Sequence, residues 1–475
     1  ISQASSAPSV CPSRRQLLAA MNDCLAGVAP CLARFVSTPV TAVAALTGRA
    51  AHSTLDPKTR GSQGMGLPAQ MKPETVDTIA ATAPVVAPKA LDITKTFYSG
   101  ILQDHSSLLA YFNPAHNVPI SEHQPQALAG SVVAYASNIR DLSPLLVPNG
   151  PVNAICHRHC ALCIIPPQYV VVHDNLMAAI GKTLGSAVTP EIAAAWSEAV
   201  LFLAKCCIDT EESLYQMAEG RSGGWSGMET FEVSDIHQVA EGIKSFTFKA
   251  PKDSPLFGES IEFTEGQYLT LKVDPEGNGL TAPRHYTVTS PPGVDFLQCT
   301  VKKIPGGKVS TYLHEKLSVG DKVQLTAPFG IFTLESTNES SVLMSAGIGV
   351  TPMVNFSKAL GKNVKLAVHV DQYPESFAYR SVFVEAGQPM LEKFTKGQGS
   401  GRPSAKGLVQ ETIEMAGADN NFYICGPPAW MEEVSAELQK AGAKSVMTEV
   451  FGSQLAQSGC PFQAKGSGCP FAGAA

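Results

Sequence analysis

The sequence has no excess of positive charge, no apolar stretch long enough to cross a bilayer, and no regular cysteine framework. Its net charge of −6 gives no basic surface for a phosphate backbone, which argues against nucleic acid as a partner. The most apolar part of the first seventy residues, 17–46, is interrupted by prolines and charged residues, which argues against a membrane span. The twelve cysteines are scattered, and several lie in apolar segments, which favours reduced thiols in a reducing compartment.

The length of 475 residues predicts about three domains at roughly 150 residues each. Residues 1–70 form an N-terminal extension that is rich in Ala, Ser, Pro and Thr and poor in acidic residues. This composition is typical of a transit peptide, although a disordered extension fits it equally well, and Met71 offers a start for a shorter form. We therefore expect a cytoplasmic protein, or a mitochondrial or plastid protein if residues 1–70 act as a transit peptide.

Three patterns of hydrophobic periodicity follow one another along the chain. Apolar residues at three- and four-residue spacing predict an all-helical domain over residues 71–222. Short alternating runs such as "QYLTLKV" predict an antiparallel β-barrel over residues 226–335. Apolar runs such as "SVLMSA" and "VKLAVHV", alternating with helical segments, predict an α/β domain with a parallel sheet over residues 336–453. Residues 454–475 repeat "SGCPF" and are expected to form a flexible tail.

The motif "PRHYTVTS" places Arg284 and Tyr286 on one face of a predicted strand, where a cation could bind a pyrophosphate and a ring could lie against a flavin. A half-buried barrel strand is the alternative. "VKKIPGGKVSTYLHEKL" then sets a glycine pair and Ser310 before a predicted helix, whose N-terminus can hold phosphate. Together with "EGQYLTL", these motifs resemble the FAD barrel of the ferredoxin-reductase family. The resemblance implies FAD contacts from Tyr268, Arg284, His285, Tyr286, Thr287 (in place of the usual serine), Gly306, Gly307, Val309 and Ser310.

Two further motifs suggest a nicotinamide site. "LMSAGIGVTPMV" is a strand that runs into a glycine turn and a helix, but the full dinucleotide fingerprint is absent, so this motif alone is weak. "FYICGPPAWMEEV" is a second such strand, and in the ferredoxin-reductase family the two turns face each other across the nicotinamide. The residues so implied are Gly347, Gly349, Thr351, Pro352, Cys425, Gly426, Pro427 and, stacking on the flavin, Phe451. The choice between NADH and NADPH stays open, because Asp371 would repel a 2′-phosphate whereas Arg380 could bind one.

The stretch "NAICHRHCALCIIPPQY" combines two histidines and three cysteines and suggests a zinc site. A closed zinc shell commonly needs a second ligand pair further along the chain, and none follows. The three- and four-residue spacing also fits cysteines that act as small core residues of a helix. A third alternative is a haem held by one neutral histidine, to which a flavin module would pass electrons.

The whole of residues 71–453 resembles a flavohaemoglobin, a globin fused to an FAD and NAD(P)H reductase. In that family the proximal histidine lies seven residues before a "P-x-Q-Y" motif, which is matched by "PPQY". The resemblance thus implies haem b, with His159 as the iron ligand, Tyr169 orienting it, and Arg158 as the basic residue between haem and flavin. His157 is left as a bystander.

The distal side of the haem is implied by the same resemblance. Tyr98 and Phe112 have the family spacing between the distal tyrosine and the phenylalanine that packs on the haem. Gln124 and Leu128, one helical turn apart, fall at the positions of the distal glutamine and leucine. The segment before Gln124 is two residues longer than the usual pattern, so Gln124 is placed by counting back from "AYASNI".

The proximal glutamate of the family falls on Ser213 when it is counted from Trp196. Loss of this carboxylate would weaken the imidazolate character of His159 and its electron donation to bound oxygen. We therefore expect Ser213 at the proximal position, while the neighbouring Glu211 and Glu212 are expected on other faces of the helix.

The resemblance implies a nitric oxide dioxygenase that converts NO and O2 to nitrate, with electrons passed from NADH or NADPH through FAD to haem. One alternative is a haem and flavin reductase that acts on a peroxide, ferric or quinone acceptor, and another is an oxygen or NO sensor or carrier. We expect no nucleic acid partner, no transmembrane segment and a monomer. Cys460 and Cys469 of the tail resemble the Cys-Pro elements of haem-regulated proteins, with an unstructured tail as the alternative.

Overall fold

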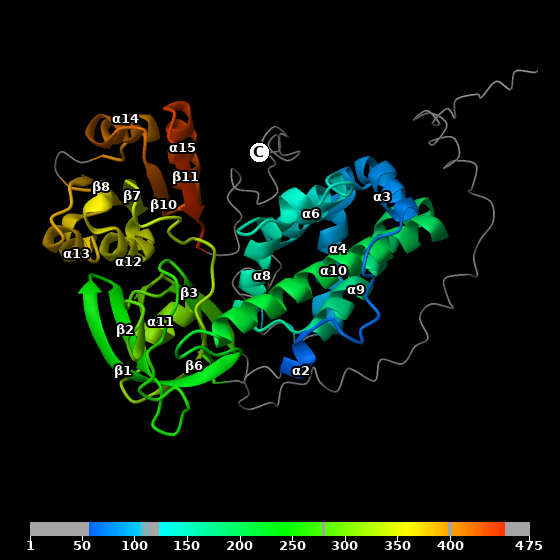
Figure 1. The fold of residues 1–475 in the computed structure, drawn as a ribbon, viewed down its shortest axis with the longest axis horizontal. Helices are drawn as coiled ribbons and strands as arrows, with labels where there is room; N and C mark the ends of the chain where they lie inside the picture. The colour runs from blue at the N-terminus through cyan, green and yellow to red at the C-terminus, as the bar shows by residue number, and fades with distance from the viewer. Residues whose placement is uncertain are drawn as a thin grey trace, which may run out of the picture.

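The computed structural model describes residues 57–105, 108, 111, 123–277, 281–397 and 401–451. Figure 1 shows a helical body joined to a β-barrel, above which lies an α/β body. Most of the predicted N-terminal extension and the predicted tail, with its two "SGCPF" repeats, lie outside the described residues, as does Phe112. This order of helical, antiparallel and parallel parts confirms the predicted fold class.

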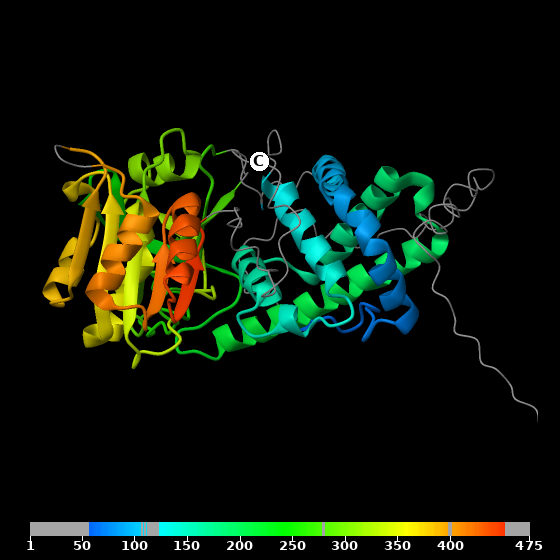
Figure 2. The same ribbon diagram turned by 90° about the horizontal axis from the view of Figure 1, so that it is seen from above.

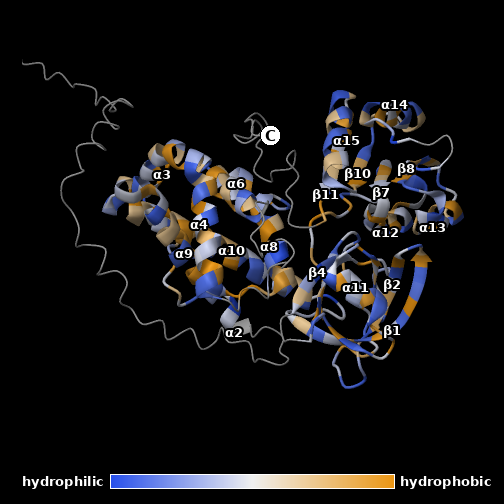
Figure 3. Ribbon diagram, turned by 180° about the vertical axis from the view of Figure 1, so that it is seen from behind, coloured by the Kyte–Doolittle hydropathy of each residue, from blue (hydrophilic) through white to orange (hydrophobic). Residues whose placement is uncertain are grey.

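The helical body is built around α10, a helix that runs from Pro190 to Glu219. Its other helices are α2 (Pro57–Arg60), α3 (Pro73–Val86), α4 (Ala90–Asp104), α6 (His123–Ser137), α7 (Ser143–Leu146), α8 (Pro151–Leu162) and α9 (Pro166–Leu184). Proline occupies the first turn of α8, α9 and α10, where its missing N–H would have no helical partner. Figure 3 shows polar and apolar residues alternating around α10, whose buried stripe packs against α3, α8 and α9.

The barrel is a six-stranded antiparallel sheet with the strand order β4-β3-β6-β1-β2-β5. Its elements are β1 (Met228–Ala240), β2 (Ile243–Lys249), β3 (Tyr268–Val273), β4 (Ala282–Thr287), β5 (Phe296–Lys302), α11 (Lys308–Glu315) and β6 (Lys322–Thr326). Alternate side chains such as Phe246, Leu269 and Leu271 are fully buried, as expected for a half-solvated sheet. The predicted joint between the helical and barrel domains falls between the end of α10 and the start of β1.

The third body is a five-stranded parallel sheet with the order β11-β10-β7-β8-β9. Its strands are β7 (Ser341–Ala346), β8 (Val364–Asp371), β9 (Met390–Phe394), β10 (Asn421–Cys425) and β11 (Ser445–Glu449), and its helices are α12 (Thr351–Leu360), α13 (Arg380–Glu385), α14 (Ala405–Ala416) and α15 (Pro428–Lys440). Figure 2 shows this body at the opposite end of the molecule from α3 and α9. Ligands of such sheets bind at the carboxyl ends of the strands. The strand order places β7 and β10 side by side, so the turns that follow them can contribute to one binding site.

Part of the predicted extension is packed against the helical body. Arg60 of α2 is 3% exposed, and its guanidinium lies 2.7 Å from Glu219 and 3.1 Å from Glu212, both on α10. The guanidinium also lies over the ring of Tyr215, 5.1 Å from its centroid. Residues 57–70 therefore contribute a buried ion pair at the end of α10 that faces the barrel.

Among the residues that the structure describes, no helix has both the length and the apolar character needed to cross a membrane.

Candidate active site

The proximal side of the predicted haem site is a hydrogen-bonded group of three side chains from α8, α9 and α10. His159 Nδ1 lies 2.8 Å from Glu211 Oε1 and 2.8 Å from the Tyr169 hydroxyl. The hydroxyl of Tyr169 also donates a hydrogen bond to Glu211 Oε1. Because a carboxylate can only accept, Nδ1 of His159 carries the proton and Nε2 keeps the lone pair that would bind iron. The structure thus brings His159 and Tyr169 into direct contact, while the iron-binding role of His159 stays a prediction.

The prediction that Ser213 occupies the proximal glutamate position is wrong, because Glu211 occupies it. Glu211 is 3% exposed and points at His159, whereas Ser213 is exposed and donates its hydroxyl to the Asp209 carbonyl at 2.9 Å. The buried stripe of α10 includes Ile208, Glu211 and Tyr215 and leaves out Ser213. This stripe was readable from the sequence, since Glu211 fills an apolar position at three- and four-residue spacing.

The cysteines around His159 are buried in the helical core rather than gathered around a metal. Cys156 and Cys160 are both fully buried, and their thiols donate to the carbonyls of Cys207 and Glu211 at 3.6 and 3.7 Å. Within the described ranges, no group of three or more His, Cys, Asp or Glu side chains has an arrangement that could hold a metal ion. The structure therefore favours the hypothesis that these cysteines are small core residues over the hypothesis that they bind zinc.

The distal side places two of the predicted residues in contact. Gln124 Nε2 of α6 donates to the hydroxyl of Tyr98 of α4 at 3.3 Å. Burial raises the pKa of Tyr98 to about 12, so its hydroxyl stays protonated at neutral pH. Leu128 is half-buried and packs against the same core. Phe112, which the resemblance places against the haem, lies outside the described residues.

Arg158 connects the helical body to the barrel, next to the predicted iron ligand His159. Its side chain interacts with Tyr268 at the start of β3 and lies close to His285 of β4 and Glu449 of β11. Burial raises the pKa of Glu449 to about 7, and the nearby Arg158 opposes this shift. The position of Arg158 between the helical body and the barrel is compatible with the predicted role, which stays a prediction. Glu449 lies two residues before Phe451, and the sequence analysis assigned it no role.

The flavin motif forms the β3-β4 edge of the barrel. Tyr268 pairs with Thr287 across the strands, and its ring lies 4.9 Å from that of His285. Arg284 and Tyr286 are both partly buried on β4, and burial lowers the pKa of Arg284 and raises that of Tyr286. The buried Thr287 keeps the hydroxyl that the usual serine would have.

The predicted phosphate turn lies just before α11. Gly306 has a φ of +73°, and Gly307 caps the helix. Ser310 Oγ accepts from the backbone N–H of Ile304 at 3.1 Å, which closes the turn, and Val309 is buried beneath it. The free N–H groups at this end of α11 suit the phosphates of FAD.

The two glycine turns of the α/β body are in direct contact, whereas the resemblance implies two turns that face each other across the nicotinamide. A Cβ at Gly349 would come 2.2 Å from the carbonyl oxygen of Cys425, and a Cβ at Gly426 would come 2.9 Å from Ala346. Thr351 and Pro352 begin α12 beside this contact, and Pro427 caps α15. Only glycine allows the backbones at these turns to approach so closely, which fits a dinucleotide lying over them.

Lys302, near the glycine turns, was not assigned to the site from the sequence, whereas Asp371 and Arg380 were weighed there as determinants of the nucleotide. Lys302 of β5 places Nζ 3.9 Å from where a Cβ on Gly347 would stand, so a cation from the barrel faces the predicted pyrophosphate turn. Asp371 ends β8, where its Oδ2 accepts from His369 Nε2 at 3.3 Å. Arg380, by contrast, is paired with Glu392 at 2.8 Å.

Phe451 follows β11 and is 42% exposed, so its ring is available on the surface for the predicted flavin contact.

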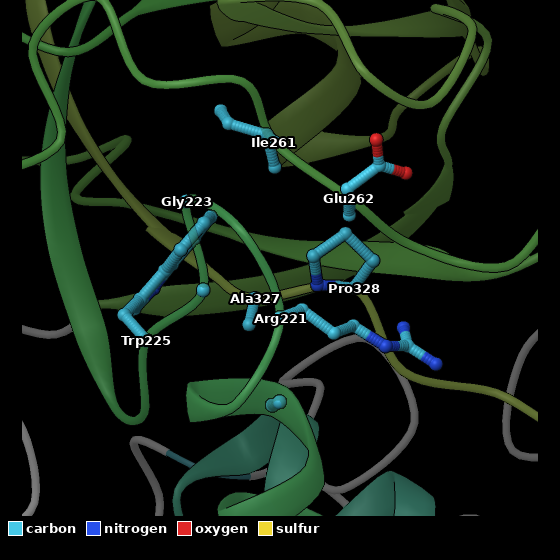
Figure 4. Close-up of a pocket in the computed structure, with 9 residues that line it drawn as sticks. Arg221, Gly223, Trp225, Ile261, Glu262, Ala327 and Pro328 are labelled. Atoms are coloured by element: carbon cyan, nitrogen blue, oxygen red, sulfur yellow. The ribbon is translucent and has the colours of Figure 1, made fainter.

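A cavity of about 10 Å³ lies at the joint of α10 and the barrel, lined in part by Arg221, Trp225 and Glu262 (Figure 4). A space of this size holds one water molecule and no substrate. Beside it, Arg221 donates to Gln267 and Thr264 at 3.0 and 3.1 Å, which fixes the joint to the barrel.

Comparisons with known proteins agree with this arrangement. A model of the globin family matches residues 95–205, and a model of oxidoreductase FAD-binding domains matches residues 230–334. A flavohemoprotein from Bacillus subtilis is 32% identical over 402 residues, which cover 80% of this chain and 98% of that protein. Flavohemoprotein A from Dictyostelium discoideum is 32% identical over 401 residues, with the same coverage.

A crystal structure of a flavohemoglobin from Malassezia yamatoensis, with bound FAD and haem, superposes with a TM-score of 0.69 at 25% identity. The match covers 80% of this chain and all of that one. The fold and the site thus define a globin joined to an FAD- and nicotinamide-binding oxidoreductase. The chain belongs to the flavohemoprotein family, and its cofactors are haem, FAD and NAD(P)H.

Proposed function

We propose that this flavohemoprotein is a nitric oxide dioxygenase, which converts NO and O2 to nitrate with electrons from NAD(P)H. FAD supplies the conversion of hydride into single electrons, and haem supplies the iron that O2 requires. The observation that carries the proposal is the carboxylate of Glu211 on His159 Nδ1, in a chain that also has a pair of distal polar groups and two facing glycine turns.

On the proximal side, Glu211 acts through His159. A carboxylate that accepts the Nδ1 proton makes the imidazole a stronger electron donor through Nε2, and Tyr169 donates to the same carboxylate oxygen. The case for a reductase of some other acceptor depended on the loss of this carboxylate at Ser213. Because Glu211 supplies it, that reason for the alternative no longer holds.

On the distal side, Tyr98 and Gln124 are the polar groups of the pocket. The amide of Gln124 donates to the Tyr98 hydroxyl, which holds these two polar groups together. A phenol is itself a hydrogen-bond donor, and Tyr98 is the group that we propose to bind a small polar ligand. In a buried pocket such a hydrogen bond is stronger than in water. The high pKa of Tyr98 keeps this donor protonated throughout the physiological range.

The proposal is tested by stopped-flow consumption of NO by the haem- and FAD-loaded protein with NADH, then with NADPH, in air-saturated and in oxygen-free buffer. We expect fast, oxygen-dependent loss of NO with nitrate as the product. Haem reduction at a normal rate with little loss of NO would favour a reductase of another acceptor. Reversible binding of O2 or NO without turnover would favour a sensor or carrier.

A further inference from the structure

His157 is a buried histidine at the contact between the helical body and the barrel. It lies on α8, two residues before His159, and is 8% exposed. Its Nδ1 accepts a hydrogen bond from the backbone N–H of Gly330 at 3.0 Å, across 173 positions of sequence. The ring also lies edge to face with Phe329, with ring centroids 6.2 Å apart. His157 therefore joins the helix of the iron ligand directly to the flavin domain.

The segment that His157 holds is the segment that fixes Tyr268. Phe329 exchanges two backbone hydrogen bonds with Tyr268, at 2.8 and 2.9 Å. Gly330 has a φ of +129°, and a Cβ there would come within 3.0 Å of the Tyr268 ring. The backbone of Gly330 thus lies against the ring that the flavin motif contributes.

The hydrogen bond places a requirement on the side chain at position 157. The Gly330 N–H is buried at this contact, and a buried donor without an acceptor costs about 1–3 kcal/mol. A ring nitrogen that carries no proton supplies the acceptor, whereas an aliphatic side chain would leave the donor unpaired. The neighbouring Arg158 reaches Tyr268 itself, so two consecutive residues of α8 hold the same part of the barrel.

We propose that His157 is a positioning residue for electron transfer, which sets the distance between the flavin and the haem by holding the 329–330 segment against α8. This inference rests on the proposed electron path and gives a role to a residue that has none in iron binding. Electron transfer slows steeply as donor and acceptor move apart, so a shift of about 1 Å at this contact should be measurable.

The test compares three variants of the full-length, haem- and FAD-loaded protein. His157→Leu removes the acceptor, His157→Asn keeps one near the position of Nδ1, and His173→Leu removes a histidine whose Nε2 is hydrogen-bonded to Ser197 within the helical body. In anaerobic stopped flow with NADH, we expect flavin reduction to be unchanged in all three. Haem reduction should be slower by about tenfold in His157→Leu only.

A second readout follows the contact itself in the same loaded protein, without turnover. Hydrogen exchange at the Gly330 amide should be slow in the wild type and in His157→Asn and should become fast in His157→Leu. If His157→Leu fails to bind haem, His157→Ala, which is smaller and cannot clash, takes its place. Unchanged haem reduction in an acceptor-free variant whose Gly330 amide exchanges fast would overturn the proposal.

Two outcomes separate this proposal from the proposed function. A wild-type protein that reduces its flavin but never its haem would contradict the electron path itself, and the inference would fail with it. A wild type that transfers electrons at the same rate as His157→Leu would contradict only the role of His157. Slower flavin reduction in His157→Leu would also count against it, because a positioning role between the domains should leave hydride transfer untouched.

Discussion

Glu211 is a charged side chain inside a helical core, where an ionised group is costly unless it is paired. Its carboxylate accepts hydrogen bonds from His159 and Tyr169, which compensate for the water it has lost. Here its partner is the histidine that would bind iron.

The substitution Glu211→Gln should therefore change the haem more than the fold. It keeps the size of the side chain and removes its charge, so electron donation through His159 should fall. We expect a lower iron–histidine stretching frequency in resonance Raman spectra and NO consumption that is reduced by about tenfold. Ser213→Ala is the matched control and should change neither quantity. An effect of Ser213→Ala without one of Glu211→Gln would contradict the assignment.

Asp371 is placed to select the nicotinamide nucleotide. It is 6% exposed at the carboxyl end of β8, the position from which an acidic residue contacts the ribose 2′-hydroxyl in dinucleotide-binding folds. Burial alone would raise the pKa of Asp371, but hydrogen bonds from His369 and the Gln372 backbone lower it, so the group is ionised at neutral pH. The 2′-phosphate of NADPH would be repelled by this negative charge.

We predict that Asp371→Ser raises the ratio of kcat/KM for NADPH to that for NADH by about tenfold, or about 1.4 kcal/mol. Arg380→Ala is the control, because the Arg380 guanidinium is already paired with Glu392 and should leave the ratio unchanged. Steady-state reduction of ferricyanide by the flavin module measures both. Loss of NADPH use in Arg380→Ala alone would show that Arg380 binds the phosphate.

Motif spacing brought together several residues that the structure places in contact, and the exceptions have physical causes. His159 and Tyr169 are fixed relative to one another by a short turn between α8 and α9, so counting along the chain was enough to pair them. Glu211 is 52 positions from His159, and counting from Trp196 selected Ser213 at the wrong face of α10. Lys302 and Glu449 come from different domains, and no local pattern predicts a contact that only the tertiary fold creates.

At the scale of elements, α10 connects three parts of the molecule. Its last third supplies Glu211 to the proximal site, and Glu212 and Glu219 of the same part hold Arg60 from the N-terminal segment. The ring of Tyr215 lies between the Arg60 guanidinium and Phe329 of the barrel. The helical pattern of α10 was readable from the sequence. The sequence did not indicate that residues 57–70 pack against the end of α10, because their composition is that of a flexible extension.

Arg60→Ala should destabilise the helical body, because it leaves buried carboxylate oxygens without their partner. We expect a loss of about 2 kcal/mol, a value below that of a fully buried pair since Glu219 is partly exposed. Arg140→Ala is the control: its pair with Asp77 is exposed on both sides and should contribute less than about 1 kcal/mol. Chemical denaturation followed by far-UV circular dichroism measures both. Equal effects of the two substitutions would contradict the role of α2.

The loss of stability caused by Arg60→Ala should depend on pH in a defined direction. The hydrogen bond from Arg60 holds the pKa of Glu219 below its ordinary value of 4.5. The stabilisation is therefore present above pH 4.5 and is lost as the pH falls and Glu219 is protonated. Chemical denaturation of wild type and Arg60→Ala from pH 7 to pH 3 should show that the difference between their free energies of unfolding becomes smaller below pH 4.5. A gap that widens toward low pH would contradict the ion pair as the cause.

At the scale of the whole molecule, the order of helical, barrel and α/β parts was predictable because each has its own hydrophobic period. The contacts between these parts were not, since they depend on single residues such as Arg158, His157 and Lys302. These three side chains lie where one domain meets the next, and each is polar. The electron path that we propose therefore passes through contacts that only the structure reveals.

The central claim is that electrons from the nicotinamide are used, through FAD and haem, to turn NO and O2 into nitrate. Oxidation of NO to nitrate releases three electrons and reduction of O2 takes up four, so each NO requires one electron from outside. The most direct measurement is therefore the amount of NADH oxidised, in air, per NO consumed and nitrate formed. We predict one NADH for every two NO, with all the NO recovered as nitrate. NADH oxidation that does not depend on NO, or NO loss without nitrate, would contradict the account.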